Sequence, residues 1–150
     1  METKTISEMS ALTYTLETTL QNMIADAGNL PFEIMDQASS LGLQLSGPQT
    51  WIYKDCYGEA DKPFELTIAV PVVAEKGSPG KFSFEKLPEL KACATIHKGG
   101  WDQIGETYTG LMRELEKKNL HFTGYSREVY HHWDMDKPEN NVTEILVEVR

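Results

Sequence analysis

Carboxyl and phenol side chains recur in two segments near the end of the chain. Glu128 and Tyr130 lie two residues apart in the segment 122–133, and Glu144 lies in the segment 142–149. A glutamate among aromatic rings loses hydration, so its pKa rises and it can act as a general acid or base near neutral pH. The same carboxylate can instead be the counter-ion of a bound cation, which aromatic ring faces also attract. These residues therefore suggest either acid–base chemistry or cation binding.

Other kinds of chemistry find little support in the sequence. His131 and His132 are adjacent in an expected strand, where adjacent side chains point to opposite faces and cannot bind one ion. Cys93 lies between alanines, and no His and Asp at a recognisable spacing would activate it. Together with Cys56 it gives neither a disulfide framework nor metal-ligand spacing. We expect no metal site, no cofactor and no cysteine nucleophile.

Hydrophobic periodicity predicts the elements that position the candidate residues. The stretch "FSFEKLPELKACATIHKGG" indicates a strand, a break at Pro88 and a second strand over 90–97 that ends at two glycines. From Trp101 onward, apolar residues recur with the spacing of one helix face: Ile104, Tyr108, Leu111, Met112 and Leu115. Two strands follow, over 122–133 and 142–149, joined by the turn "DMDKPENN". The second half is therefore predicted to be β-α-β-β.

The first half of the chain matches the second at an offset of 77 residues. Gly47 then aligns with Gly124 and Tyr53 with Tyr130, and the offset holds without a gap from residue 34 to residue 72. The first half is expected to contain a strand near 13–17, a helix around 30–41, and strands over 49–57 and 64–72. A constant offset favours internal duplication over shared periodicity. We predict one α+β domain made of duplicated β-α-β-β modules, over about 1–73 and 82–150 with a linker at 74–81, that form a mostly antiparallel sheet.

Alternation along the strands predicts which side chains share a face. Ile145, Val147 and Val149 are expected to face the helices, as are Ile52 and Val129. The opposite face would then carry the aromatic and acidic residues: Trp51, Tyr53, Glu128, Tyr130 and Glu144. We expect this face, away from the helices, to form a concave groove of the kind that binds small molecules.

The candidate ligand-binding residues are those of this face together with Trp101 and Tyr108 from the helix. Trp101 would be an anchor of the core or of the groove wall, and the place of Tyr108 on the buried helix stripe also fits plain core packing. The strand aromatics have a second interpretation as ordinary sheet residues. Glu144 can also be interpreted as a surface carboxylate paired with Lys or Arg, and Glu128 as a solvated acid.

Composition narrows the class of partner. The chain has 150 residues, the size of one domain, and a formal net charge of −9. An acidic surface repels phosphate backbones, which opposes direct nucleic-acid binding. No apolar run approaches the ~20 residues of a bilayer span, and "METKTISEMSALTYTL" lacks the basic and apolar regions of a signal peptide. We expect a cytoplasmic protein with no membrane partner, whose ligand is neutral or cationic.

Three stretches resemble the GyrI-like small-molecule-binding domain, the effector-binding module of some MerR-type and AraC-type multidrug regulators. They are "FELTIAVPV" at 64–72, "HKGGWDQIGETYTGLMRELEKKNL" at 97–120 and "SREVYHHWDMDKPENNVTEILVEV" at 126–149. The resemblance covers nearly the whole chain and implies two strand–helix–strand–strand modules around a ligand groove.

The resemblance also implies a role for one carboxylate. In such regulators a buried glutamate among aromatics receives lipophilic cations, and the matching position here is Glu144. The first hypothesis is a stand-alone bacterial protein that binds lipophilic, cationic or aromatic xenobiotics. The second is a hydrolase of strained electrophiles such as cyclopropanoid alkylators, with Glu144 activating water and Tyr130 (or Tyr53) polarising the leaving oxygen. The third is a protein that modulates a partner such as gyrase, or that works with a separate transcription factor.

Overall fold

The structure, a computed structural model, describes all 150 residues. Its elements are β1 (Glu2–Ile6), β2 (Met9–Thr18), α1 (Met23–Ala27), α2 (Leu30–Ser40), β3 (Thr50–Lys54), β4 (Phe64–Val72), β5 (Ser83–Leu87), β6 (Leu90–Lys98), α3 (Ile104–Lys117), β7 (Phe122–His132) and β8 (Val142–Val149), with 3-10 turns at Trp101–Gln103 and Pro138–Asn140. Each half of the chain thus contains two strands, a helical region and two further strands, and the predicted α+β class is confirmed. None of its helices is both long and apolar enough to span a membrane.

All eight strands belong to one antiparallel sheet in the order β1-β6-β8-β7-β3-β4-β2-β5. The order is symmetric about its centre, where β7 of the second half pairs with β3 of the first. In that pair Trp51 lies directly opposite Glu128, and these two residues are also equivalent at the offset of 77. The two halves therefore meet around Trp51 and Glu128, which the sequence placed at matching positions.

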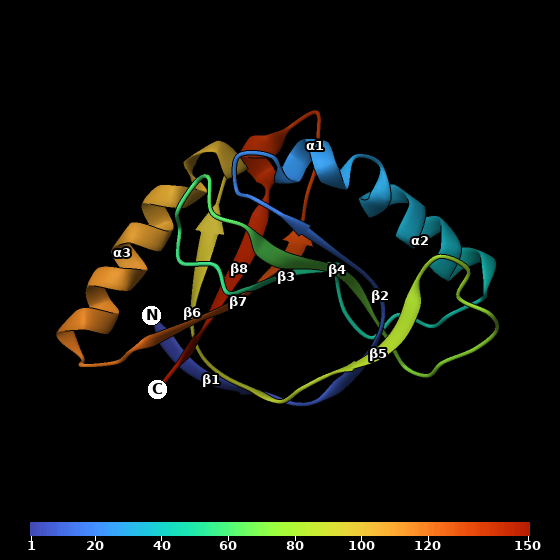
Figure 1. Ribbon diagram of the computed structural model, residues 1–150, viewed down its shortest axis with the longest axis horizontal. Helices are drawn as coiled ribbons and strands as arrows, with labels where there is room; N and C mark the ends of the chain where they lie inside the picture. The colour runs from blue at the N-terminus through green and yellow to red at the C-terminus, as the bar shows by residue number, and fades with distance from the viewer.

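The outer strands form a ribbon that joins the two ends of the sheet. Residues 2–6 pair with residues 90–94, and residues 9–13 pair with residues 83–87 in the same register. β1 and β2 therefore continue one another, as do β5 and β6, with kinks at Ser7–Glu8 and Pro88–Glu89. In Figure 1 the three helices lie above the sheet, and this ribbon runs below it. Both faces of the sheet are therefore covered.

Each helix packs on the strands of its own half. On α2, Ile34 and Ala38 contact the cluster that contains Ile68 and Val70. On α3, Leu111 and Leu115 pack against a cluster that contains Ile145, Val147 and Val149. The last three residues face a helix as predicted, because they alternate with Glu144 and Leu146 on the other face.

The side of the sheet covered by the ribbon has its own apolar clusters. They are Ala11, Ile52, Ala69 and Leu87, and Leu90, Ala92, Ala94 and Leu146, with Val129 packed against the second. The prediction that Ile52 and Val129 face the helices is therefore wrong. Directly paired residues share a face: Ile52 lies opposite Thr67, while Trp51 lies opposite Ile68 and Glu128 opposite Ile145.

Arg127 ties the ribbon to the centre of the sheet. Only 1% of its surface is exposed, and it lies on the ribbon side of β7. Its Nη2 donates to the carbonyl of Pro88 at the ribbon kink, at 2.8 Å, and its Nε donates to the Tyr125 hydroxyl at 3.0 Å. This holds β7, which also carries Glu128 on its opposite face, against the crossing strands.

Candidate functional site

A cavity of about 1100 Å³ lies on the helix side of the sheet. Its walls come from α1 and the start of α2 on one side and from α3 on the other, with β3 and β7 beneath. In Figure 1, α3 lies on one side and α2 on the other, with α1 between them at the top. The groove is therefore on the same face as the helices, and the prediction that it faces away from them is wrong.

Glu128 lies at the base of this cavity, with 6% of its surface exposed. Three tyrosine hydroxyls donate to its carboxylate: Tyr53 to Oε1 at 3.1 Å, Tyr130 to Oε1 at 2.8 Å and Tyr108 to Oε2 at 2.6 Å. They come from β3, β7 and α3, so both halves of the chain contribute. The carboxylate forms no ion pair with any Lys, Arg or His.

Burial sets the acidity of this group. It raises the pKa of Glu128 above its usual range, and the three tyrosine hydrogen bonds and the nearby His97 act the other way without cancelling it. Burial also raises the pKa of Tyr53, Tyr108 and Tyr130 well above their usual range, and the Glu128 charge adds to this. The three phenols therefore remain protonated donors at neutral pH, and Glu128 has no basic side chain in direct contact with it.

Two indole rings form walls beside the tyrosines. The rings of Trp51 and Trp101 lie edge-on to the Tyr130 ring, at centroid distances of 6.0 and 5.3 Å. Their N–H groups are already bonded, from Trp51 to the Gln49 amide oxygen and from Trp101 to the Thr143 hydroxyl, each at 2.9 Å. The donors of Trp51 and Trp101 and of the three tyrosines are thus used within the protein, so these residues offer a ligand mainly ring faces and apolar surface.

The structure brings together all but one of the predicted site residues. Six of them line the cavity: Trp51, Tyr53, Trp101, Tyr108, Glu128 and Tyr130. Glu144 does not, because it lies opposite Val129 on the ribbon side of the sheet. It accepts a hydrogen bond from Lys4 Nζ at 2.5 Å and another from His131 Nε2 at 2.9 Å. The placement of Glu144 in the groove is corrected, and the carboxylate of the cavity is Glu128.

The surroundings of Glu144 also differ chemically from those of Glu128. Burial acts to raise the pKa of Glu144, but hydrogen bonds from Lys4 and His131, with their charges, outweigh it and hold the pKa below its usual range. The carboxylate is thus already compensated within the protein. Its interpretation as a carboxylate paired with a basic residue describes this arrangement.

The sequence prediction missed several apolar side chains that line the cavity. They are Met23, Ile24, Ala27, Phe32, Met112, Trp133 and Met135. Of these, Ile24 and Met135 are strongly exposed, at 70% and 67%. The five residues of α1 span little more than one helical turn, too few for a periodic pattern. The available signal was Met135, an apolar residue within the otherwise polar turn "DMDKPENN".

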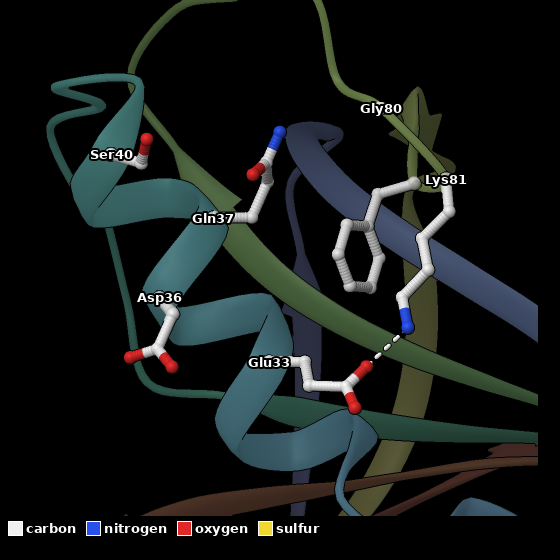
Figure 2. A pocket seen from close by; sticks show the side chains of 7 residues that line it. Glu33, Asp36, Gln37, Ser40, Gly80 and Lys81 are labelled. Atoms are coloured by element: carbon white, nitrogen blue, oxygen red, sulfur yellow. Dashed lines mark hydrogen bonds and ion pairs between the residues drawn. The ribbon is translucent and has the colours of Figure 1, made fainter.

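A second hollow lies on the outer side of α2. Figure 2 shows Glu33, Asp36, Gln37 and Ser40 from α2 facing Gly80 and Lys81 of the 79–82 segment, with Lys81 paired to Glu33. It is about half the volume of the main cavity, at 540 Å³, and is open and mostly polar. No three His, Cys, Asp or Glu side chains of the chain are arranged to hold a metal ion.

Comparison with known proteins assigns the family. A model of the GyrI-like small molecule binding domain matches residues 1–150. The chain belongs to the GyrI-like family. No curated protein matches it.

Several solved structures share the GyrI-like fold. The EcmrR C-terminal domain has a TM-score of 0.81 at 19% identity, with 99% of this chain and 96% of that one covered. SAV2435 bound to tetraphenylphosphonium has a TM-score of 0.70 at 12% identity, with 99% and 93% covered. A hydrolase encoded by lin2189 from Listeria innocua has a TM-score of 0.61 at 12% identity, with 99% and 91% covered. At these identities the likeness establishes the fold.

Proposed function

We propose that this GyrI-like chain binds lipophilic organic cations in the helix-side cavity, with Glu128 as their counter-ion. The observation that carries the proposal is a buried carboxylate without a basic partner, on the floor of a large and mainly apolar cavity. Removing a carboxylate from water is costly unless a charge or hydrogen bonds compensate it. The three tyrosines supply hydrogen bonds, and a ligand would supply the charge.

The walls favour an aromatic or bulky cation. Ring faces of Trp and Tyr attract cations by ~0.5–2 kcal/mol each, depending on desolvation, and Trp51, Trp101 and Tyr130 border the cavity. The volume of about 1100 Å³ is ample for a drug-sized ligand. SAV2435, a protein of the same fold, has been solved with the lipophilic cation tetraphenylphosphonium, which supports the proposal by analogy of fold.

Titration with tetraphenylphosphonium by isothermal calorimetry tests the proposal. We expect saturable binding to the wild type and at least about tenfold weaker binding to Glu128→Gln, because the amide keeps the shape but loses the charge (~1.4 kcal/mol per tenfold change). The matched control is Glu144→Gln, which removes a buried carboxylate outside the cavity and should leave the affinity unchanged. Equal weakening by both substitutions would contradict the assignment to Glu128.

A second candidate function is hydrolysis of strained electrophiles. It is favoured by the Tyr108 hydroxyl at 2.6 Å from Glu128 Oε2, beside a carboxyl whose raised pKa suits proton transfer near neutral pH. Glu128 would then activate water, and Tyr108 or Tyr130 would donate to the leaving oxygen. Incubation with a cyclopropane-containing alkylator, followed by mass spectrometry, should give a product that gains one water and is lost in Glu128→Gln. Unchanged alkylator would leave binding as the function.

A further inference from the structure

His97 lies behind the site, outside the cavity lining, with 6% of its surface exposed. Both of its ring nitrogens are bonded: Nε2 to the Gly100 carbonyl oxygen at 2.8 Å and Nδ1 to the Thr107 hydroxyl at 2.7 Å. A carbonyl can only accept, so Nε2 carries the proton and the neutral ring accepts the Thr107 hydroxyl at Nδ1. One imidazole therefore joins the end of β6 to two different segments.

The first segment leads to one oxygen of Glu128. Gly100 immediately precedes Trp101, whose ring lies 5.3 Å from that of Tyr130. Tyr130 in turn donates to Glu128 Oε1 at 2.8 Å. Gly99 has a φ of 109°, a left-handed conformation suited to glycine, and its N–H donates to the Asn141 carbonyl at 2.9 Å. The bond from His97 to the Gly100 carbonyl thus fixes the turn that places Trp101.

The second segment leads to the other oxygen. Thr107 immediately precedes Tyr108 on α3, and Tyr108 donates to Glu128 Oε2 at 2.6 Å. Because consecutive residues of a rigid helix keep a fixed relation, holding Thr107 also sets the approach of Tyr108. The imidazole therefore holds two segments: one carries Tyr108, which donates to Oε2, and the other carries Trp101, which packs on Tyr130, a donor to Oε1.

We propose that His97 is a positioning residue for the cation site, an inference that rests on the proposed function of Glu128. It sets the placement of Trp101 and Tyr108 around the carboxylate without touching the ligand. His97 pairs with Thr143, and the equivalent pair of the first half is Leu16 with Leu66, so the counterpart of His97 is Leu16, while that of Glu128 is Trp51. The second half of the chain therefore has both the imidazole and the carboxylate, and the first half has neither at the matching positions.

Two conservative variants separate the two bonds. His97→Gln retains a side-chain N–H to reach the Gly100 carbonyl and loses the acceptor for Thr107, whereas His97→Asn retains that acceptor and loses the bond to Gly100. Thr107→Val removes only the hydroxyl. For each we expect a dissociation constant for tetraphenylphosphonium about fivefold above that of the wild type, with native far-ultraviolet circular dichroism. Thr107→Val should add nothing in the His97→Gln background, because the same bond is already lost.

A spectroscopic measurement distinguishes positioning from plain stabilisation. The indole N–H resonance of Trp101, assigned with Trp101→Phe, should shift in ligand-free His97→Asn and remain near its wild-type position in His97→Gln. Lower thermal stability with a dissociation constant within twofold of the wild type and an unmoved Trp101 resonance would overturn the proposal. If the wild type fails to bind tetraphenylphosphonium, the cation-binding function fails instead. The Trp101 resonance, with the carboxyl carbon-13 shift of Glu128, would still decide whether His97 positions these groups.

Discussion

Glu128→Gln should raise the melting temperature near pH 8 while it abolishes tight cation binding. The folded protein has to hold an ionised carboxylate in a buried site, which is why the pKa of Glu128 is raised. A raised pKa means that this group's contribution to stability is fully present below the pKa of the unfolded state and is lost as the pH rises through the folded pKa. The amide avoids that loss and can still share hydrogen bonds with the three tyrosines.

Thermal unfolding of the wild type and of Glu128→Gln across a pH series shows whether the substitution stabilises or destabilises the fold. We expect a gain of roughly 1–3 kcal/mol for the variant near pH 8, the cost of an uncompensated buried polar group, which is several degrees for a domain of this size. The gain should shrink as the pH falls through the raised pKa of Glu128, because the protonated carboxyl resembles the amide. A variant less stable than the wild type near pH 8 would show that the carboxylate is compensated within the protein.

Glu144→Gln provides the opposite control. The folded pKa of Glu144 is lowered, so its contribution is present above the unfolded pKa and is lost as the pH falls through the folded pKa. The amide weakens the bonds to Lys4 and His131 and should lower the melting temperature near neutral pH, with the difference fading in acid. Two buried glutamates on opposite faces of one sheet would thus respond to the same substitution with opposite signs, because only Glu144 has basic partners.

The sequence predicted Glu144 as the carboxylate of the cavity, whereas the structure has Glu128 there, and this difference shows what the sequence could and could not predict. The order and type of the main elements followed from periodicity, because α3 and the long strands carry strong patterns. The face of each residue did not, because a shift of one residue in pairing moves every side chain to the other face. Alternation usually resolves this, but β4 is buried on both sides from Leu66 to Val72. Because the ribbon covers the second face of the sheet, residues on that face are also apolar, and the alternation of polar and apolar residues is lost.

Irregularities in β7 also made it hard to predict which face of the sheet each residue occupies. The pairing of β7 with β8 shifts between Phe122 and Ser126 and again between Tyr130 and His132. Gly124 has a φ of 88° within the first irregularity, and such bulges change which residues face one another. The useful signal was chemical: Glu128 has Tyr130 two residues away and Trp51 at its matching position. The aromatic residues singled out from the sequence line the cavity, even though the face was assigned wrongly.

The sharpest expected discrimination is between two ligands of nearly the same shape and opposite charge. Tetraphenylphosphonium and tetraphenylborate present the same four phenyl rings to the walls, so hydrophobic burial and shape are matched. The phosphonium gains attraction from Glu128, and the borate meets repulsion from it in a cavity of low dielectric. The N–H groups of Trp51 and Trp101 and the hydroxyls of the three tyrosines around Glu128 are already bonded, to Gln49, Thr143 and Glu128 respectively, and do not offer donors to an anion.

We therefore expect the wild type to bind the phosphonium at least about 100-fold more tightly than the borate, a difference of ~2.7 kcal/mol. In Glu128→Gln the ratio should fall toward unity. The phosphonium binds more weakly because it loses its counter-ion, and the borate binds more tightly because it loses the repulsion. Glu144→Gln should retain the wild-type ratio, since that carboxylate lies on the other face. A ratio that survives in Glu128→Gln would assign the selectivity to the overall charge of −9, and it would then weaken steeply with added salt. A ratio that disappears in Glu128→Gln and resists salt would assign it to one buried carboxylate.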